Sequence, residues 1–260
     1  MLDLNADKVW KQALEDCGKD YHYESNPRHL KIRERINYNY TVDMKEPLIC
    51  NIERNLNYGF MFGEASWILK GRNDLEYIEK FMKNYAKYSD DGFSLNGAYG
   101  PKIMDQLSWA AKELKQDNDS RRCYINIWRE RPGESKDIPC TTGMQFLIRD
   151  GLLNAVVNMR SQDIVYGMTY DVFTFTMVAK ALQLLLYSSY NLMVDIGYLH
   201  VRAGSAHIYE PDYDKIDTWI NNKAFNKKVP ISLQSVLNSS LTVSDLADKL
   251  SNAGKALGNN

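Results

Sequence analysis

Hydrophobic side chains recur with two different periods along the chain, and the period changes near residue 30. Residues 1–18 carry apolar positions at the spacing of an amphipathic helix, namely Val9, Trp10, Ala13 and Leu14, and Gly18 is a stop signal. The segment KIRERINYNYTVDM alternates instead, and the strand that it predicts carries on one face Ile32, Ile36, Tyr38, Tyr40 and Val42. The chain therefore opens with a helix and a half-buried strand.

Helical spacing returns in the next segments. A stretch from Glu64 to Leu69 and a second one opened by Asp74 are separated by Gly71 and Asn73, which predicts a helical hairpin or a broken helix. A further helix has Pro101 at its start and the polar run KQDNDS at its end. Its inward positions are Ile103, Leu107, Ala110 and Leu114.

Strand signals dominate the middle of the chain. RRCYINIWRE predicts one strand, and the runs GMQFLIRD and LLNAVVNMR flank Asp150-Gly151, which is a strong hairpin signal. We expect a long helix from about Asp171, a β-rich stretch over residues 197–209, a helix opened by Pro211, and a tail that ends loosely. The sequence shows no repeat and no linker, so residues 1–260 read as one α+β domain with helices around one mixed β-sheet.

Composition excludes some classes of partner. Opposite charges nearly cancel, with a net charge of -1, so charge alone predicts neither a nucleic-acid partner nor a membrane surface, and an anionic ligand must be met locally. The early acidic residues exclude a signal peptide. The apolar stretch from Val172 to Tyr187 contains polar residues and is shorter than the roughly 20 residues of a membrane span, which favours a buried core helix.

The four cysteines are widely spaced and form no CxxC pair, which predicts a reduced, cytoplasmic protein without a metal site. Cys17, Cys50 and Cys123 read as buried, inert side chains. Pro139-Cys140-Thr141 stands just before a strand, where a rigid loop can present a thiol. Cys140 is therefore the candidate nucleophile.

Three arginines belong to the same candidate site. Arg121 and Arg122 follow the run DNDS, and Arg160 closes the strand that the hairpin places beside Cys140. Cationic neighbours lower a thiol pKa and bind phosphate bidentately. Taken alone, an arginine pair is more often a solvated surface feature. Together with the cysteine, the three predict a nucleophilic site for a phosphorylated substrate.

The motifs DNDSRRCYINIW, IPCTTGMQF, NMRSQDIVYGMTYD and GSAHIY, in this order and spacing, resemble the thymidylate synthase family. FGEASWILKGRND resembles the glutamate-bearing helix of that family, and INYNYTVDMKEPLI resembles its first strand. The resemblance covers most of the chain. It implies a three-layer α/β/α-like fold with a large mixed β-sheet, a homodimer, and 5,10-methylenetetrahydrofolate as co-substrate.

The resemblance also implies roles for individual residues. Cys140 would add to C6 of a pyrimidine nucleotide, and Glu64 would act as general acid and base. Arg160 and Ser161 match phosphate ligands of the same subunit, whereas Arg121 and Arg122 match arginines that reach the partner's active site. The remaining matches are His207 and Tyr209 at the sugar hydroxyl, Gln145 beside the cysteine, Asp163 and Gly167 near base and folate, Tyr99 and Trp67 at the cofactor, and Arg28 in a phosphate loop.

Asp171 departs from the methylating members, which have an asparagine there. An asparagine amide can donate to O4 of uracil and accept from N3-H, whereas a carboxylate can accept from the 4-amino group of cytosine and share the N3 proton. The segment LIRDGLLNAVVNMRSQDIVYG also resembles the corresponding segment of the deoxycytidylate hydroxymethylases. Thr141 stands where the family has a histidine. The alternative for Asp171 is a helix N-cap.

These features predict a deoxycytidylate 5-hydroxymethyltransferase that converts dCMP, methylenetetrahydrofolate and water to 5-hydroxymethyl-dCMP and tetrahydrofolate. The ending AGKALGNN lacks the apolar residues that close the site in methylating members, which favours water as the final reactant, and Ser161 favours a deoxynucleotide. The alternatives are methylation of dUMP or dCMP, hydroxymethylation of CMP, and an inactive nucleotide- or RNA-binding relative.

Overall fold

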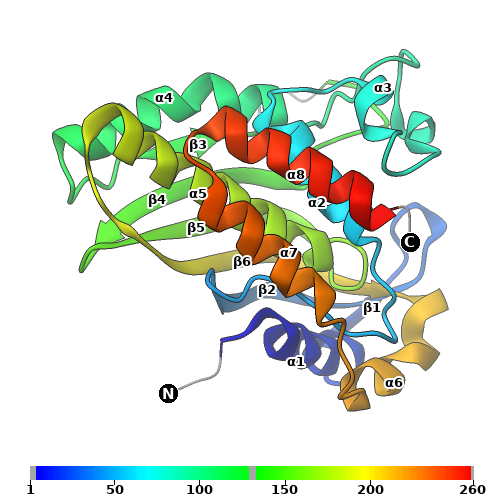
Figure 1. The fold of residues 1–260 in the computed structure, drawn as a ribbon. Coiled ribbons are helices and arrows are strands. Elements are labelled where there is room, and N and C mark those ends of the chain that lie inside the picture. Colours follow the sequence, from blue (N-terminus) through cyan, green and yellow to red (C-terminus); the bar gives the residue numbers. More distant parts are fainter. Residues whose placement is uncertain (1–3, 129–132, 259–260) are drawn as a thin grey trace.

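The computed structural model describes residues 4–128 and 133–258, and its centre is a six-stranded mixed sheet (Figure 1). The strand order is β1-β2-β6-β5-β4-β3, and every neighbouring pair is antiparallel except the parallel pair β5 and β6. The strands are β1 Tyr23–Ser25, β2 Ile32–Asp43, β3 Tyr124–Asn126, β4 Thr141–Arg149, β5 Leu152–Asp163 and β6 Asp195–Tyr209.

Groups of helices and groups of strands follow one another along the chain, and the sheet is mostly antiparallel, which confirms the α+β class. The helices are α1 Ala6–Gly18, α2 Tyr58–Leu69, α3 Leu75–Ile78, α4 Gly100–Gln116, α5 Met168–Tyr190, α6 Ile216–Asn221, α7 Lys228–Ser239 and α8 Val243–Gly258. Short three-ten turns cover Pro27–His29, Tyr85–Tyr88 and Glu210–Lys215. Helices α1 and α4 and strand β2 lie where the sequence pattern places them.

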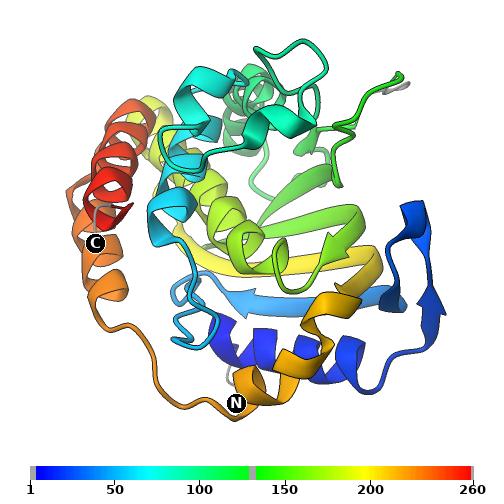
Figure 2. The ribbon, with the colours of Figure 1, turned by 90° about the vertical axis from the view of Figure 1, so that its right-hand side faces the viewer.

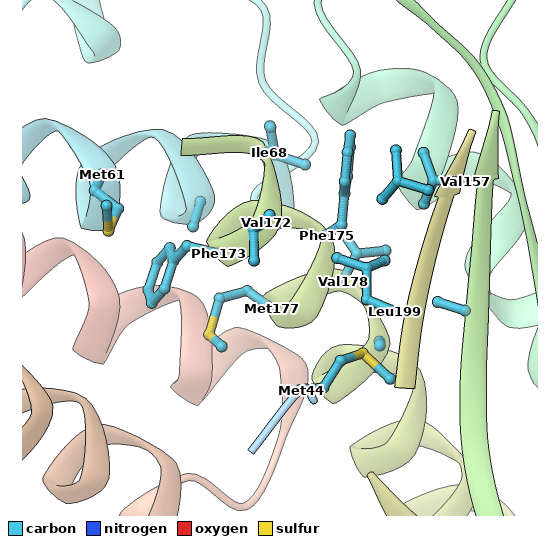
Figure 3. Close-up of a cluster of buried hydrophobic side chains, with 14 of the residues drawn as sticks. Met44, Met61, Ile68, Val157, Val172, Phe173, Phe175, Met177, Val178 and Leu199 are labelled. Atoms are coloured by element: carbon cyan, nitrogen blue, oxygen red, sulfur yellow. The ribbon is translucent and has the colours of Figure 1, made fainter. Parts of the chain in front are cut away.

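Helix α5 is the core of the molecule, as the sequence predicts. Phe173 stacks on Phe62 of α2 with ring centroids 4.9 Å apart, and Phe175 and Val178 face Val157 of the sheet (Figure 3). The helix has 23 residues, longer than the stretch considered in the sequence, and by length and composition it would reach across a membrane. Most of it is buried inside the molecule, so packing against the sheet accounts for its apolar character.

The hairpin between β4 and β5 forms at the predicted place. Asp150 has φ 51° and Gly151 has φ 73°, as both central residues of a type I′ turn require. The turn fixes the register that pairs Thr141 with Met159 at the far end of the strands. This register sets Arg160 beside Cys140.

The expectation of a loose tail is wrong, because α7 and α8 form there, with α8 beside α2 (Figures 1 and 2). Small residues let the two backbones approach: a Cβ on Gly59 would lie 2.7 Å from Gly258 Cα, and one on Gly254 would lie 2.9 Å from Gly59 O. Leu246 and Leu250 bury the apolar face of α8. The tail therefore supports the helix that carries Glu64.

Two other expected elements are shorter than the pattern indicates. Asp74 caps α3 by accepting from the Tyr77 N–H, but α3 ends at Ile78. The strand expected over RRCYINIWRE is regular only in β3, and its last two residues lie outside the described residues. Beyond β3, the N–H groups of Ile127 and Trp128 both donate to Thr142 O, so the regular ladder ends there.

A change of side-chain parity crosses the central strands. The buried positions of β5 are odd-numbered up to Met159 and then include Gln162, while those of β6 are odd-numbered up to Ala203 and then include Ala206. Such irregularities turn the following side chains to the opposite face of the sheet. As a result, Gln162 points into the helix-covered side.

In β2 the same irregularity falls at Asn37, whose φ is 57°. Ile36, which the alternating pattern placed on the buried face, is 57% exposed, whereas Tyr40 and Val42 beyond Asn37 are buried. The prediction for Ile36 is wrong because a uniform alternation was assumed across a left-handed residue.

The other face of the sheet is accessible in the single chain. One row of paired residues crosses it from strand to strand, with Thr41, His200, Val156, Gln145 and Tyr124 in register. The His200 ring contacts the Thr41 hydroxyl at 3.0 Å, and Tyr124 is 38% exposed. This row is half-buried or exposed, in contrast to the apolar face under α5.

Candidate active site

Cys140 lies immediately before β4, where the backbone is held by Arg160. The Arg160 N–H donates to Cys140 O at 2.9 Å, and its guanidinium donates to Pro139 O at 3.0 Å and Ile138 O at 2.9 Å. Its Nη2 lies 3.8 Å from the Cys140 Sγ. The predicted pairing of cysteine and arginine is therefore present within one chain, and the arginine also fixes the loop that presents the thiol.

The electrostatic expectation for the thiol needs a correction. Burial raises the pKa of Cys140 above its ordinary value, the Arg160 guanidinium opposes this shift, and the charge of Asp171 adds to it. In the single chain desolvation outweighs the arginine. Arg160 thus moderates the pKa without bringing it below the ordinary range.

Asp171 lies in the first turn of α5, inside the site. Its own N–H donates to Gly167 O, and α5 begins at Met168, so Asp171 is not the N-cap and that alternative is wrong. Its Oδ2 accepts from Gln162 Nε2 at 3.0 Å. Burial raises the pKa of Asp171 to about 7; the Gln162 hydrogen bond opposes the shift and Asp163 adds to it. The carboxyl therefore changes charge near neutral pH.

Glu64 lies in the middle of α2 and is electrostatically linked to Asp171. The Tyr85 hydroxyl donates to Glu64 Oε1 at 3.4 Å. Burial first, and then the charge of Asp171, raise the pKa of Glu64 to about 8, while the Tyr85 hydrogen bond lowers it. A glutamic acid that is protonated near neutral pH can both donate and later accept a proton.

Tyr99 joins the same cluster from the residue before α4. The Thr141 N–H donates to its hydroxyl at 3.3 Å, and burial, together with the charges of Asp171 and Cys140, raises the pKa of Tyr99 well above its ordinary value. Trp67 differs, because it is only 4% exposed and its indole N–H donates to Asp74 O at 3.1 Å. The structure brings Tyr99 to the cysteine and leaves Trp67 in the core.

A second group of predicted residues gathers where β5 and β6 end. Asp163 pairs with His207 in the sheet, and its Oδ1 accepts from the backbone N–H of Val165 at 2.7 Å. The His207 ring lies edge-on to Tyr209 at 5.0 Å, and burial lowers the pKa of His207. Gly167 is tightly placed, since a Cβ there would lie 2.8 Å from Asp163 O. Gly167 and Asp163 are the members of this group that adjoin Asp171, and Asp163 connects them to His207.

Ser161 and Arg28 flank this group. Ser161 pairs with Ser205 across the parallel strands. Arg28 is exposed in the turn Pro27–His29 with φ 54°, and its charge lowers the pKa of both Cys140 and His207. Arg28 is therefore within electrostatic reach of the site.

Arg121, Arg122 and Gln145 do not join the cluster within one chain. Arg122 is an exposed side chain that pairs with Glu113 at 2.9 Å. Gln145 stands on the accessible face of the sheet, where its Nε2 donates to Arg121 O at 2.8 Å. The placement of Gln145 beside the cysteine is not seen, because its side chain points to the opposite face from the buried β4 residue Met144.

Three site residues escaped the reasoning from sequence: Gln162, Tyr40 and Tyr85. Gln162 stands in the motif NMRSQD, but regular alternation from Val157 would have turned it away from the helices. The alternating pattern assigns Tyr40 to the apolar face of its strand without marking it as a site residue, and no sequence pattern singles out Tyr85. In the described part of the chain, no group of three or more His, Cys, Asp or Glu could hold a metal ion.

The fold places the half-buried thiol of Cys140 beside the Arg160 guanidinium and within electrostatic range of the Asp171 carboxyl. Residues 8–248 match the family model described as thymidylate synthase. The chain belongs to the thymidylate synthase family.

Similar proteins come from phages and from a bacterium. A deoxyuridylate hydroxymethyltransferase of Pseudomonas phage M6 is 37% identical over 124 residues, which are 44% of this chain and 35% of that protein. One of Bacillus phage SP01 is 29% identical over 181 residues, 62% of this chain and 45% of that protein. A thymidylate synthase of Vesicomyosocius okutanii subsp. Calyptogena okutanii (strain HA) is 22% identical over 166 residues, 59% of this chain and 61% of that protein. The chain thus spans between 35% and 61% of these relatives.

Proposed function

We propose that this protein is a folate-dependent pyrimidine nucleotide C5 hydroxymethyltransferase whose substrate is dCMP. The observation that carries the choice of base is the carboxyl of Asp171, which is half-buried at the site, accepts from Gln162 and has its pKa raised to about 7. Membership of the thymidylate synthase family and the names of the phage relatives support hydroxymethyl transfer.

Asp171 favours cytosine because the pair can hold one shared proton. The cytosine 4-amino group donates to a carboxylate oxygen, and a proton between N3 and the second oxygen completes the contact. A carboxyl with a pKa near 7 can donate this proton to N3 when it is neutral and can accept it when it is ionised. Uracil would set O4 against an acceptor whenever Asp171 is ionised.

Cys140 supplies the nucleophile of the proposed reaction. After the thiol proton passes to solvent water, the Sγ thiolate forms a bond to C6, and the electron pair of the C5=C6 bond moves to C5, which becomes nucleophilic. Arg160 stabilises the developing thiolate from 3.8 Å, and we infer that a bound phosphate would draw on the same guanidinium together with Ser161. Once C5 carries the one-carbon unit and its hydrogen has left as a proton, elimination of Sγ from C6 restores the C5=C6 bond and the thiolate of Cys140.

Methylenetetrahydrofolate supplies the one-carbon unit when bound, and the family is folate-dependent. The residues near the cysteine fit such a co-substrate: the half-buried Tyr99 ring offers an aromatic surface, and the protonated Glu64 offers a donor for ring nitrogens. Asp163 and Gly167 would bound the same space. Trp67 contributes only from the core. Glu64 then holds the proton that must leave as water adds its oxygen to the one-carbon unit.

A homodimer completes the proposed site. Arg121 and Arg122 are exposed and lie beside Gln145 and Tyr124 on the accessible face of the sheet. Packing of two such faces would bring these arginines to a second copy, since a twofold interface is formed by the same patch on both subunits. We therefore assign them to the phosphate of the partner's site.

The test is incubation of the protein with dCMP labelled at C5 and methylenetetrahydrofolate. We expect release of the C5 hydrogen and a product heavier than dCMP by one formaldehyde unit, without dihydrofolate. Formation of dihydrofolate, seen by its near-ultraviolet absorbance, would instead indicate methylation. Absence of hydrogen release from any pyrimidine nucleotide would favour an inactive binding protein.

A second candidate, hydroxymethylation of dUMP, is favoured by the names of three phage relatives. A panel of dCMP, dUMP and CMP separates the candidates. Asp171→Asn should move preference from dCMP towards dUMP by about tenfold or more, because an amide donates to O4 and accepts from N3-H. An unchanged ratio would contradict base reading by Asp171.

A further inference from the structure

Asp171 is the end of a hydrogen-bond chain that runs through three elements. The Tyr40 hydroxyl of β2 donates to Gln162 Oε1 at 3.0 Å, and Gln162 Nε2 of β5 donates to Asp171 Oδ2 of α5 at 3.0 Å. Tyr40 is 8% exposed and Gln162 is 2% exposed. The two side chains are thus removed from water and directed at the carboxyl that reads the base.

The ionised form of Asp171 fixes the direction of this chain, because a carboxylate can only accept and therefore requires the amide nitrogen of Gln162 as its partner. The hydroxyl of Tyr40 satisfies the carbonyl end of the Gln162 amide, so the amide nitrogen, which can only donate, faces Asp171. Oδ2 must therefore accept. While the Tyr40 hydroxyl holds the amide in this orientation, a proton taken up by Asp171 belongs on Oδ1, because a proton on Oδ2 would meet another donor.

Without this constraint a neutral carboxyl is ambiguous. It can put its proton on either oxygen and so present donor and acceptor in either order. One order matches cytosine, with an acceptor at N3 and a donor at position 4, and the reverse order matches uracil. Fixing the order therefore selects one base.

We propose that Gln162, oriented by Tyr40, is a specificity-positioning residue that holds Asp171 Oδ2 as an acceptor and so lets the carboxyl read one pyrimidine only. This inference rests on the proposed function of the same site. Gln162 reaches Asp171 only because the parity of β5 changes after Met159. Selection of the base therefore depends on the irregularity in β5 that directs Gln162 towards Asp171.

Other charged and titratable groups also act on Asp171 or respond to its charge, so a pH profile must be read with them in mind. They come from several elements packed around the site: Asp163 at the end of β5, Glu64 on α2, Tyr40 on β2, Tyr99 before α4 and Cys140 before β4. Because rates with both substrates share these groups, the ratio of kcat/KM for dCMP and dUMP isolates the contribution of base reading.

The experiment measures this ratio between about pH 6 and pH 8 for the wild type, Gln162→Leu and Tyr40→Phe. We expect a wild-type ratio that changes little with pH. Gln162→Leu should lower the ratio by about tenfold at the acidic end, where Asp171 is neutral and free to present either order. Tyr40→Phe should act in the same direction more weakly, since the amide can then rotate.

Two controls separate positioning from a general structural effect. Gln183→Leu removes another half-buried amide from α5, one that donates to Val194 O at 2.7 Å, and should keep the wild-type ratio. In the double variant Gln162→Leu with Asp171→Asn, the ratio should not vary with pH, because the amide does not titrate.

The outcomes distinguish this inference from the proposed function. If dCMP is used and both Gln162→Leu and Tyr40→Phe keep the wild-type ratio at every pH, the positioning role is overturned. A wild type that uses dUMP alone would overturn the dCMP proposal, yet Gln162→Leu should then gain turnover of dCMP. Should Gln162→Leu fail to fold, Tyr40→Phe, which conserves the ring, decides the question.

Discussion

The two halves of the candidate site differ in how the chain builds them. Cys140, Glu64 and Asp171 converge within one chain, in surroundings where burial raises the pKa of all three groups. Arg121 and Arg122 are exposed and lie outside that cluster. The first half is positioned by the core, whereas the second depends on a surface.

This difference teaches where each kind of chemistry can be placed. Desolvation tunes the carboxyls for proton transfer, and only packing around α2 and α5 supplies it. Phosphate binding needs full positive charge, which an exposed arginine keeps without cost. A second copy of the chain would join the two halves.

The largest effect is expected for the nucleophile. Cys140→Ala should lower release of the C5 hydrogen from labelled dCMP by at least about 10⁴-fold, because no other group can form the bond to C6. Cys123→Ala is the matched control, since that thiol is buried and its pKa is raised to about 12. Equal rates for Cys140→Ala and the wild type would remove covalent catalysis from the proposal.

The second largest effect on activity is expected for the two exposed arginines, Arg121 and Arg122. The double variant Arg121→Ala with Arg122→Ala should lower kcat/KM by about 10- to 100-fold, mainly through KM, because charge-assisted hydrogen bonds to phosphate are lost. Mixing this variant with Cys140→Ala should restore about a quarter of the wild-type activity if subunits exchange and each site borrows the partner's arginines. No recovery after verified exchange would place these arginines outside the partner's site.

A moderate effect is expected for the free energy of unfolding, because desolvation of the Asp171 carboxyl destabilises its ionised form. Its folded pKa of about 7 lies above the ordinary value of 3.8, so the protonated form is favoured in the folded state, and stability falls as pH rises through about 7. Asp171→Asn should therefore gain on the order of 2 kcal/mol in the free energy of unfolding relative to the wild type between pH 5 and pH 8. Urea unfolding at both pH values measures this, and equal differences would contradict the shift.

The smallest effect is expected for the stability of the Arg122→Ala variant. Arg122→Ala removes an ion pair with Glu113 in which the arginine side chain is 75% exposed, and Ser120 still donates to Glu113. Exposed ion pairs contribute little, so the urea midpoint should move far less than for Asp171→Asn at pH 8. A large loss of stability would mean that Arg122 stabilises the fold in addition to any role in phosphate binding.

Local patterns alone predicted several elements and contacts. Apolar spacing located α1, α4 and the buried α5, and Asp150-Gly151 fixed the hairpin that brings Arg160 to Cys140. These features depend on residues close in sequence, through helix periodicity and turn geometry. The motifs also indicated the family and the convergence of Cys140, Glu64 and Asp171.

Only the tertiary structure decided the rest. The contact of α8 with α2 depends on glycines about 195 residues apart, and the direction of Gln162 depends on a change of parity shared by neighbouring strands. The pKa values of Asp171 and Glu64 depend on burial by several elements at once. The sequence by itself determined which groups are present, whereas desolvation and sheet geometry, which are sums over distant segments, decided their charge and their direction.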